Sequence, residues 1–270
     1  MALNMKKRLD SILVERGVVS GRDRAAAAVM AGLVYIGGEK EIKPGRMFDE
    51  DVVIEYRGER EKYKSRGGYK LEKALDVFGI TLSEKTSMDI GASTGGFTDC
   101  ILQNGAKLVY AVDVGYGQLA WELRNNERVV NMERTNIRYL EDEKLNGAMD
   151  FISIDVSFIS LKLVLPMASR LLCGGGECVC LIKPQFEAGR GEVGKGGVVK
   201  DVAIHKSVIE KVIGYAFEAG FGVCGLSYSP IKGPKGNVEY LLYIKKGSNG
   251  RDVDIDGVVA EAHLKLGVRN

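Results

Sequence analysis

The chain has 270 residues, of which 45% are hydrophobic and 27% are charged. These are ordinary values for a folded globular protein, and they exclude intrinsic disorder as its main state. The formal net charge is only +2, which excludes a strong overall field for nucleic acid or membranes, so any polyanion site must be local.

The first sixty residues predict a small α+β unit. Leu9, Ile12 and Leu13 share one stripe of a helix at 8–16, and a second helix ends at Gly32. Short alternating strands around a Pro44-Gly45 turn then predict a small hairpin sheet. Since 57–66 has almost no apolar content, we expect an N-terminal domain at 1–58, a linker at 59–66 and a larger domain at 67–270.

The larger domain alternates predicted strands and helices. The strands are expected at 87–90, 108–114, 129–133, 150–156, 177–182, 222–228 and 238–245. The helices are expected near 96–104, 117–125, 159–172 and 201–219. This alternation predicts an α/β fold with a mostly parallel sheet covered on both faces. No helix separates the last two strands, so we expect them to form a hairpin that makes the last strand antiparallel.

The loop after the first strand of this domain, in "SMDIGASTGGFTD", is rich in glycine and hydroxyl residues. A strand, a glycine turn and a helix N-terminus form a backbone that a nucleoside can approach closely, and Asp113 at the end of the next strand could accept ribose hydroxyls. The loop has neither the G-x-G-x-x-G spacing nor a P-loop, which disfavours a pyrophosphate or triphosphate. The pattern therefore suggests S-adenosylmethionine. The alternative is a tight turn, with Asp113 capping the following helix.

Several longer motifs resemble the TlyA family of ribosomal-RNA 2′-O-methyltransferases, some of which were labelled haemolysins. These motifs are "SRGGYKL", "DIGASTGGFTD", "VDVGYGQLAW", "ERTN", "DVSFIS", "LIKPQFE" and "GNVEY". The resemblance covers nearly the whole chain. It implies an FtsJ-like, Rossmann-like domain with a seven-stranded sheet, joined to a small RNA-binding domain named after ribosomal protein S-four. The implied activity is S-adenosylmethionine-dependent methylation of cytidine ribose in 16S and 23S rRNA.

Four polar residues match the Lys-Asp-Lys-Glu tetrad of the FtsJ-like family: Lys70, Asp155, Lys183 and Glu239. A ribose 2′-hydroxyl is a very weak acid, so its methylation needs a base and a cation near the developing alkoxide. Lysine is a poor base near neutrality, but burial and a second cation can make it a better one. We hypothesise that Lys183 is the base, that Lys70 favours its neutral form and steadies the alkoxide, and that both acids orient the amines.

The resemblance also implies the cofactor contacts. They are main-chain contacts from Gly91, Ala92, Ser93 and Gly95, ribose contacts from Asp113, contacts near the adenine from Thr135 and Asn136, and Asp155 beside the methyl donor. Many related enzymes have an acidic residue where Asn136 stands, which leaves the adenine amine contact open. We expect Trp121 to pack in the core, since it lies on an amphipathic helix near Leu119 and Leu123.

Candidate RNA-binding residues lie in two regions. Lys7, Arg8, Arg22 and Arg24 lie at helix N-termini, where cations are unfavourable unless a phosphate compensates, and Lys43 and Arg46 flank the hairpin turn. In the glycine-rich stretch after Lys183, we expect Arg190 and Lys195 to close on RNA and Phe186 to stack on a flipped base. Ordinary solubilising charges are the alternative.

Other features predict a cytoplasmic, monomeric protein without a metal. Five cysteines with no C-x-x-C pair indicate reduced thiols, and neither a signal peptide nor a membrane span is present. The two histidines, His205 and His263, have no ligand-like companions in the sequence. Two other functions stay open: a non-catalytic rRNA-binding assembly factor and a membrane-active haemolysin.

Overall fold

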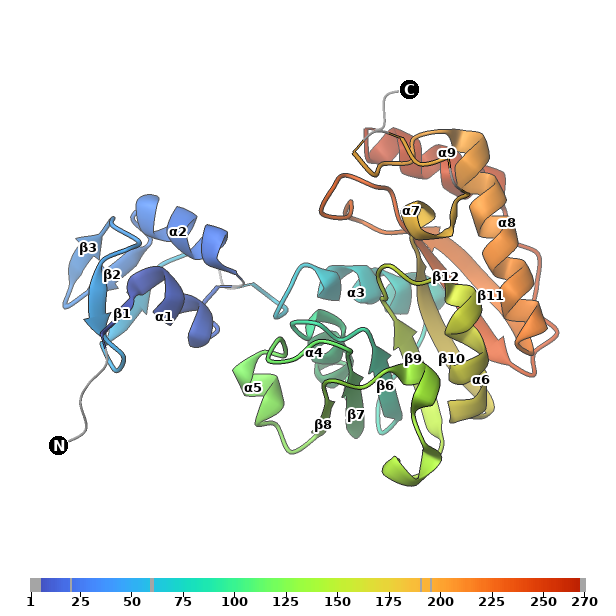
Figure 1. Ribbon diagram of the computed structural model, residues 1–270, viewed down its shortest axis with the longest axis horizontal. Coiled ribbons are helices and arrows are strands. Elements are labelled where there is room, and N and C mark those ends of the chain that lie inside the picture. Colours follow the sequence, from blue (N-terminus) through green and yellow to red (C-terminus); the bar gives the residue numbers. More distant parts are fainter. Residues whose placement is uncertain (1–5, 20, 59–60, 190, 195, 268–270) are drawn as a thin grey trace.

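The computed structural model describes residues 6–19, 21–58, 61–189, 191–194 and 196–267. A seven-stranded sheet forms the centre of the larger unit, in the order β11-β12-β10-β9-β6-β7-β8 (Figure 1). Its strands are β6 (Thr86–Ile90), β7 (Leu108–Val112), β8 (Val129–Met132), β9 (Met149–Ile154), β10 (Leu172–Ile182), β11 (Phe221–Tyr228) and β12 (Tyr240–Lys246). Strand β12 is antiparallel to both β10 and β11, and the other neighbouring pairs are parallel. The predicted fold class is confirmed.

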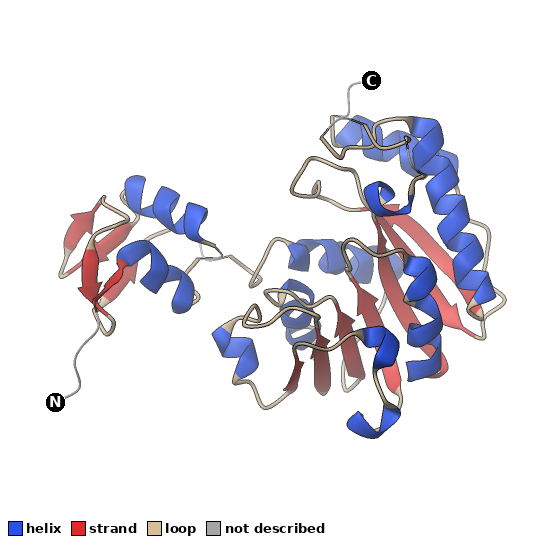
Figure 2. Ribbon diagram, viewed as in Figure 1, coloured by secondary structure: helices blue, strands red, loops and turns tan. Residues whose placement is uncertain are grey.

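Helices cover both faces of this sheet, as Figure 2 shows. They are α3 (Gly67–Phe78), α4 (Gly96–Gln103), α5 (Trp121–Arg124), α6 (Leu165–Leu171), α7 (Pro184–Glu187), α8 (Val202–Glu218) and α9 (Ile255–Lys265), with short 3-10 turns η1 (Ile137–Tyr139), η2 (Asp142–Lys144) and η3 (Leu161–Leu163). Because side chains alternate along a strand, Val109 and Ala111 of β7 belong to the buried cluster that includes α3 and α4, whereas Tyr110 and Val112 belong to the cluster on the other face, which includes α6, α8 and α9. The sheet is thus buried on both sides.

The smaller N-terminal unit has its own core, formed by Leu9, Leu13, Val19, Ala25, Val29 and Val34. Its elements are β1 (Lys6–Arg8), α1 (Leu9–Glu15), α2 (Arg22–Met30), β2 (Val34–Ile36), β3 (Glu39–Glu41), β4 (Met47–Asp49) and β5 (Ile54–Tyr56). The single hairpin sheet that we predicted was wrong: β3-β2-β5 and β1-β4 form two sheets. Residues 6–8, for which no strand was predicted, form β1 and pair with β4.

The later part of the expected linker lies on the larger unit. Tyr63 is buried in the cluster that contains Leu71 of α3, and its hydroxyl donates to Glu72 at 2.9 Å. The Lys64 backbone N–H donates to Asp99 of α4 at 2.9 Å. These contacts hold the chain entry to α3 against α4.

Two predicted helices are shorter than expected. The helix expected at 117–125 begins only at Trp121, because Glu133 accepts the backbone N–H groups of Gln118 and Leu119, at 2.7 and 3.2 Å, and holds them in a loop. The helix expected at 159–172 divides into η3 and α6. Helix α9 was not predicted; it begins where Asp254 accepts the Gly257 N–H at 2.8 Å.

Candidate active site

The glycine loop after β6 brings backbone, rather than side chains, to the carboxyl edge of the sheet. Gly91 and Ala92 donate their N–H groups to the Val112 carbonyl, at 2.8 and 3.1 Å, which joins the loop to β7. Gly91 has φ +88°, and a Cβ there would lie 2.5 Å from the Asp155 carbonyl oxygen. Gly95 also has a positive φ, of +95°, and it begins α4. The close approach of the loop to the backbone after β9 therefore requires glycine at position 91.

Asp113 connects this loop to the next one. Its carboxylate accepts the Ser93 N–H and the Gly115 N–H, both at 2.7 Å. Each carboxylate oxygen has a second lone pair, so Asp113 can still accept hydroxyl donors from a ribose. Its expected ribose contact is chemically feasible in this position and stays a prediction.

Thr135 and Asn136 lie where the chain leaves β8. The Thr135 N–H donates to the Asp113 carbonyl at 2.9 Å, which places Thr135 beside the expected ribose site. Asn136 Oδ1 accepts the Arg138 N–H at 3.1 Å and caps η1. With its oxygen in the cap, Asn136 would meet a base through its amide nitrogen, which donates where a carboxylate would accept.

Asp89 supports the loop from below. It is fully buried, and its two oxygens accept hydrogen bonds from Thr98 Oγ1 at 2.7 Å and Ser153 Oγ at 3.0 Å. Burial raises the pKa of Asp89 to about 7. The carboxyl group therefore links β6, α4 and β9 directly beneath the glycine loop.

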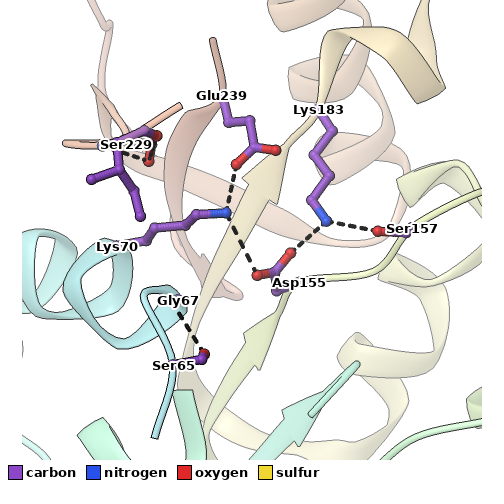
Figure 3. A network of polar contacts seen from close by, with 9 residues as sticks. Ser65, Gly67, Lys70, Asp155, Ser157, Lys183, Ser229 and Glu239 are labelled. Atoms are coloured by element: carbon purple, nitrogen blue, oxygen red, sulfur yellow. Dashed lines mark hydrogen bonds and ion pairs between the residues drawn. The ribbon is translucent and has the colours of Figure 1, made fainter. Parts of the chain in front are cut away.

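The four residues of the expected tetrad meet in one place (Figure 3). The Lys70 amine lies 2.6 Å from Glu239 Oε2 and 3.9 Å from Asp155 Oδ2. The Lys183 amine lies 2.6 Å from Asp155 Oδ1, an ion pair whose angles fall short of a hydrogen bond, and it donates to Ser157 Oγ at 3.0 Å. Asp155 thus stands between two amines, and both lysines are largely buried.

The fold explains this convergence. Asp155 and Lys183 follow the carboxyl ends of β9 and β10, Glu239 precedes β12, and Lys70 projects from the first turns of α3. Parallel strands open their ligand crevice at this edge. A cavity of about 320 Å³ is lined by all four tetrad residues and by the loop residues Gly91, Ala92 and Ser93.

Sequence reasoning missed three residues at this site. Ser157 accepts from Lys183, and Lys232 lines the cavity from the loop before β12. Phe158 is 91% exposed with φ +63°, and its ring centroid lies 4.9 Å from that of Phe186 in α7. The sequence offered no signal for the exposure of Phe158, since phenylalanine is among the residues most often fully buried.

The chain is similar to several known methyltransferases and to a solved structure. The FtsJ-like methyltransferase model matches residues 63–246. The Bacillus subtilis protein YqxC is 50% identical, over 97% of this chain and 95% of its own. The "16S/23S rRNA (cytidine-2'-O)-methyltransferase TlyA" of Mycobacterium tuberculosis is 43% identical, over 89% of this chain and 90% of its own. The solved structure of a hemolysin-like protein from Streptococcus thermophilus has a TM-score of 0.75 at 47% identity and covers 98% of both chains.

This chain is a TlyA-type member of the FtsJ-like methyltransferase family. Its methyl donor is S-adenosylmethionine. The residues fit such a ligand, because Gly91, Ala92 and Ser93 line the cavity and Asp113 presents carboxylate oxygens next to Ser93. The tetrad then lies next to the expected position of the sulfonium methyl group.

Four of the six expected RNA-binding cations in the N-terminal unit of this TlyA-type protein already contact carboxylates. Lys7 pairs with Glu15 and Glu50, Arg8 with Asp10, Arg24 with Glu61 and Arg46 with Glu41; Arg22 donates to Ser11 Oγ, and Lys43 lies beside Arg46 in the loop before β4. The pairs of Lys7 with Glu15 and Glu50 are exposed, and such pairs are weak and can exchange for phosphate, whereas the carboxylates of Asp10 and Glu41 are buried. Arg190 and Lys195 lie outside the described residues.

The prediction that Trp121 packs in the core is wrong. Its side chain is 66% exposed rather than packed in the core, whereas Leu119 and Leu123 are buried. The late start of α5 places Trp121 at the first helical position, so the expected amphipathic face does not form there.

The cysteines form no disulfide bonds, since all five are free thiols. Among the described residues, no cluster of His, Cys, Asp and Glu could hold a metal ion. No helix in the same part of the chain is both long and apolar enough to cross a membrane.

Proposed function

We propose that this protein methylates the 2′-hydroxyl of a cytidine ribose in ribosomal RNA. The observation that carries the proposal is the position of Asp155, whose two oxygens lie 2.6 Å from Lys183 and 3.9 Å from Lys70, beside the glycine loop. A weakly acidic hydroxyl needs this combination of a base and a fixed cation. The printed name of the M. tuberculosis relative supports cytidine and rRNA as the substrate class.

The bound cofactor supplies an electrophilic methyl group on a sulfonium. In its neutral form, after it has released its own proton, the Lys183 amine takes the proton of the 2′-hydroxyl, with Ser157 and Asp155 fixing the direction of the amine. Lys70, oriented by Glu239, faces the developing alkoxide and stabilises its charge. The walls of the cavity hold the hydroxyl in line with the methyl group, which removes much of the entropic cost of the reaction.

The aromatic pair beside the tetrad suits the base of the target nucleotide. Phe158 faces solvent, and the Phe186 ring centroid lies 5.9 Å from Lys183 Nζ. A cytosine turned out of its stack would be held on Phe158 and Phe186, which brings its ribose to Lys183. This arrangement selects an unpaired or flipped nucleotide.

The N-terminal unit would hold the RNA at a distance from the reaction. We assign residues 1–58 to an RNA-binding domain, 59–66 to the connection and 67–270 to the catalytic domain. The cations from Lys7 to Arg46 supply phosphate contacts, and Arg190 and Lys195 would close over the target. The protein acts as a monomer in the cytoplasm, where its ribosomal substrates are found.

The test uses purified ribosomal subunits and labelled S-adenosylmethionine. We expect label in the ribose of a cytidine, mapped by reverse-transcription stops at low dNTP, and no label with Lys183→Ala, although that variant still binds cofactor. Lys107→Ala is the matched control, since Lys107 is exposed at the opposite end of the sheet, before β7. Label in a base would contradict the chemistry. RNA binding without any label would favour an assembly factor, and lysis of red cells without label would favour a haemolysin.

A further inference from the structure

The two histidines of the chain lie side by side, next to the strand that follows Glu239. His205 of α8 is fully buried, and its ring centroid lies 4.9 Å from that of His263 in α9. His205 Nδ1 is 2.6 Å from the Tyr240 hydroxyl and 3.2 Å from His263 Nε2, while His205 Nε2 is 3.0 Å from the Val199 carbonyl oxygen. One ring therefore connects α8, α9, β12 and the segment before α8.

These contacts specify the state of the His205 ring. A carbonyl oxygen can only accept, so His205 Nε2 carries the proton and donates to Val199. Nδ1 is then an acceptor, and the Tyr240 hydroxyl donates to it. Burial and the nearby His263 lower the pKa of His205, whereas Asp201 before α8 raises it. The pKa of His263 is itself lowered, by burial and by Lys232. The buried ring is neutral.

Asn237 holds the same segment from the other side. Its Oδ1 accepts the Val199 N–H at 3.0 Å, and its Nδ2 donates to the Gly197 carbonyl at 2.8 Å. Asn237 is only 2% exposed, so these bonds form out of contact with water. Both polar groups of the Val199 backbone are thus bound by side chains, one from α8 and one from the approach to β12. We call His205, Asn237 and Tyr240 the clamp.

The clamp is connected to Glu239 along the chain and through Gly233. Asn237 lies two residues before Glu239 and Tyr240 directly follows it, and the Asn237 carbonyl accepts the Gly233 N–H at 2.9 Å. Gly233 lies so close to the Glu239 carboxylate that a Cβ there would be 2.5 Å from Oε1. The position of the clamp therefore decides where the Glu239 carboxylate, and with it the Lys70 amine, can lie.

We propose that His205 and Asn237 are positioning residues for methyl transfer, which act by fixing Glu239 against Lys70. The inference rests on the proposed function, and neither residue touches the reacting atoms. A displacement of about 1 Å at a catalytic group can reduce the rate by about a hundredfold, so loss of the clamp lowers kcat rather than cofactor affinity.

The first experiment reads the ring directly. With only two histidines in the chain, nitrogen NMR of histidine-labelled protein gives two ring systems, and His263→Gln assigns them. We expect the Nε2–H tautomer for His205 at pH 7.5 and titration below the ordinary value of about 6.5. An Nδ1–H tautomer or a charged ring at pH 7.5 would overturn the proposal, whatever the enzyme methylates.

The second experiment compares the kcat of variants. Each kcat is divided by the fraction of molecules that bind cofactor, which calorimetry measures as the binding stoichiometry. Asn237→Ala and His205→Ala should lose about tenfold or more in kcat, while His205→Gln, whose amide can still donate to Val199, should stay within about threefold of the wild type. Asn104→Ala is the matched control, because Asn104 also donates to a backbone carbonyl, that of Cys100 at 2.8 Å, but in α4. If a clamp variant does not fold, Tyr240→Phe is measured in its place, because it removes only the hydroxyl that donates to His205. Equal kcat per cofactor-binding molecule in clamp and control variants would refute the clamp, whereas an inactive wild type would refute the proposed function instead.

Discussion

Lys70 and Glu239 are 169 positions apart in the chain, yet the Lys70 amine donates to Glu239 Oε2 at 2.6 Å in the interior of the protein. Glu239 is almost fully buried, and Lys70 nearly so. Each of these two buried charges stabilises the other, because a buried charge without a partner of opposite sign lowers the free energy of unfolding. The pair therefore matters for stability as well as for chemistry.

Removing one partner should destabilise the protein more than removing both. We expect Glu239→Ala to lower the free energy of unfolding by about 3–5 kcal/mol, because it leaves the Lys70 charge buried beside a distant Asp155. The double variant Lys70→Met with Glu239→Leu should recover much of this loss and remain inactive. Urea denaturation measures the first effect and methyl transfer the second. A double variant as unstable as Glu239→Ala would argue against the burial of a charged Lys70.

Gly91→Ala should weaken cofactor binding by about tenfold or more, because a Cβ 2.5 Å from the Asp155 carbonyl forces the loop away from β9. Calorimetric titration with S-adenosylmethionine gives the affinity. Gly147→Ala is the matched control, since Gly147 also has a positive φ, +103°, but nothing lies within 4 Å of its added Cβ. If both variants bind the cofactor with the affinity of the wild type, the position of the loop against β9 does not matter for cofactor binding.

The stability of Asp89→Asn relative to the wild type should depend on pH. Burial raises the pKa of Asp89 to about 7, from 3.8, so between these values the folded protein holds a proton that the unfolded chain has lost. The stabilisation from this proton is full below pH 4 and is lost as the pH rises to about 7. Asparagine does not titrate, so its contribution to stability does not change with pH. The free energy of unfolding of the variant should therefore rise relative to that of the wild type between pH 5 and pH 8, by an amount on the order of a few kcal/mol. Thermal melts at both pH values test this, and a constant difference would contradict the raised pKa.

Phe158→Ala should reduce methyl transfer to rRNA by about tenfold and leave cofactor affinity unchanged, because loss of one base-stacking surface costs about 1–3 kcal/mol. The fold should be unaffected, since the side chain is 91% exposed. Phe217→Ala on α8 is the control, as another exposed phenylalanine, at 54%. Unchanged kcat/KM for RNA in Phe158→Ala would remove the aromatic pair from the substrate site.

Local patterns were sufficient to predict the sheet. Strands such as β6 and β7 are short apolar runs between turn residues, and the missing helix between β11 and β12 correctly predicted an antiparallel last strand. The late start of α5 could not be predicted in this way, because Glu133 determines it by binding backbone groups fourteen or more positions earlier in the chain. Tertiary hydrogen bonds of this kind leave no periodic signal.

The identity of the tetrad came from matching motifs, and the structure adds the distances between its members. Ser157 could not be distinguished from an ordinary loop serine until its contact with Lys183 was visible. The clamp was missed for the same reason: His205 and Tyr240 are 35 positions apart and have no motif in common. Only the fold brings α8 next to β12 at this point.

The insertion of β12 between β10 and β11 has a consequence for synthesis. Residues 240–246 occupy an inner position of the sheet, so β10 and β11 lack their shared neighbour until this strand is translated. A growing polypeptide cannot assemble Lys70 with its carboxylate partner before that moment, since Glu239 directly precedes this strand. The catalytic centre therefore forms only after residues 240–246 have left the ribosome, although Lys70, Asp155 and Lys183 are translated much earlier.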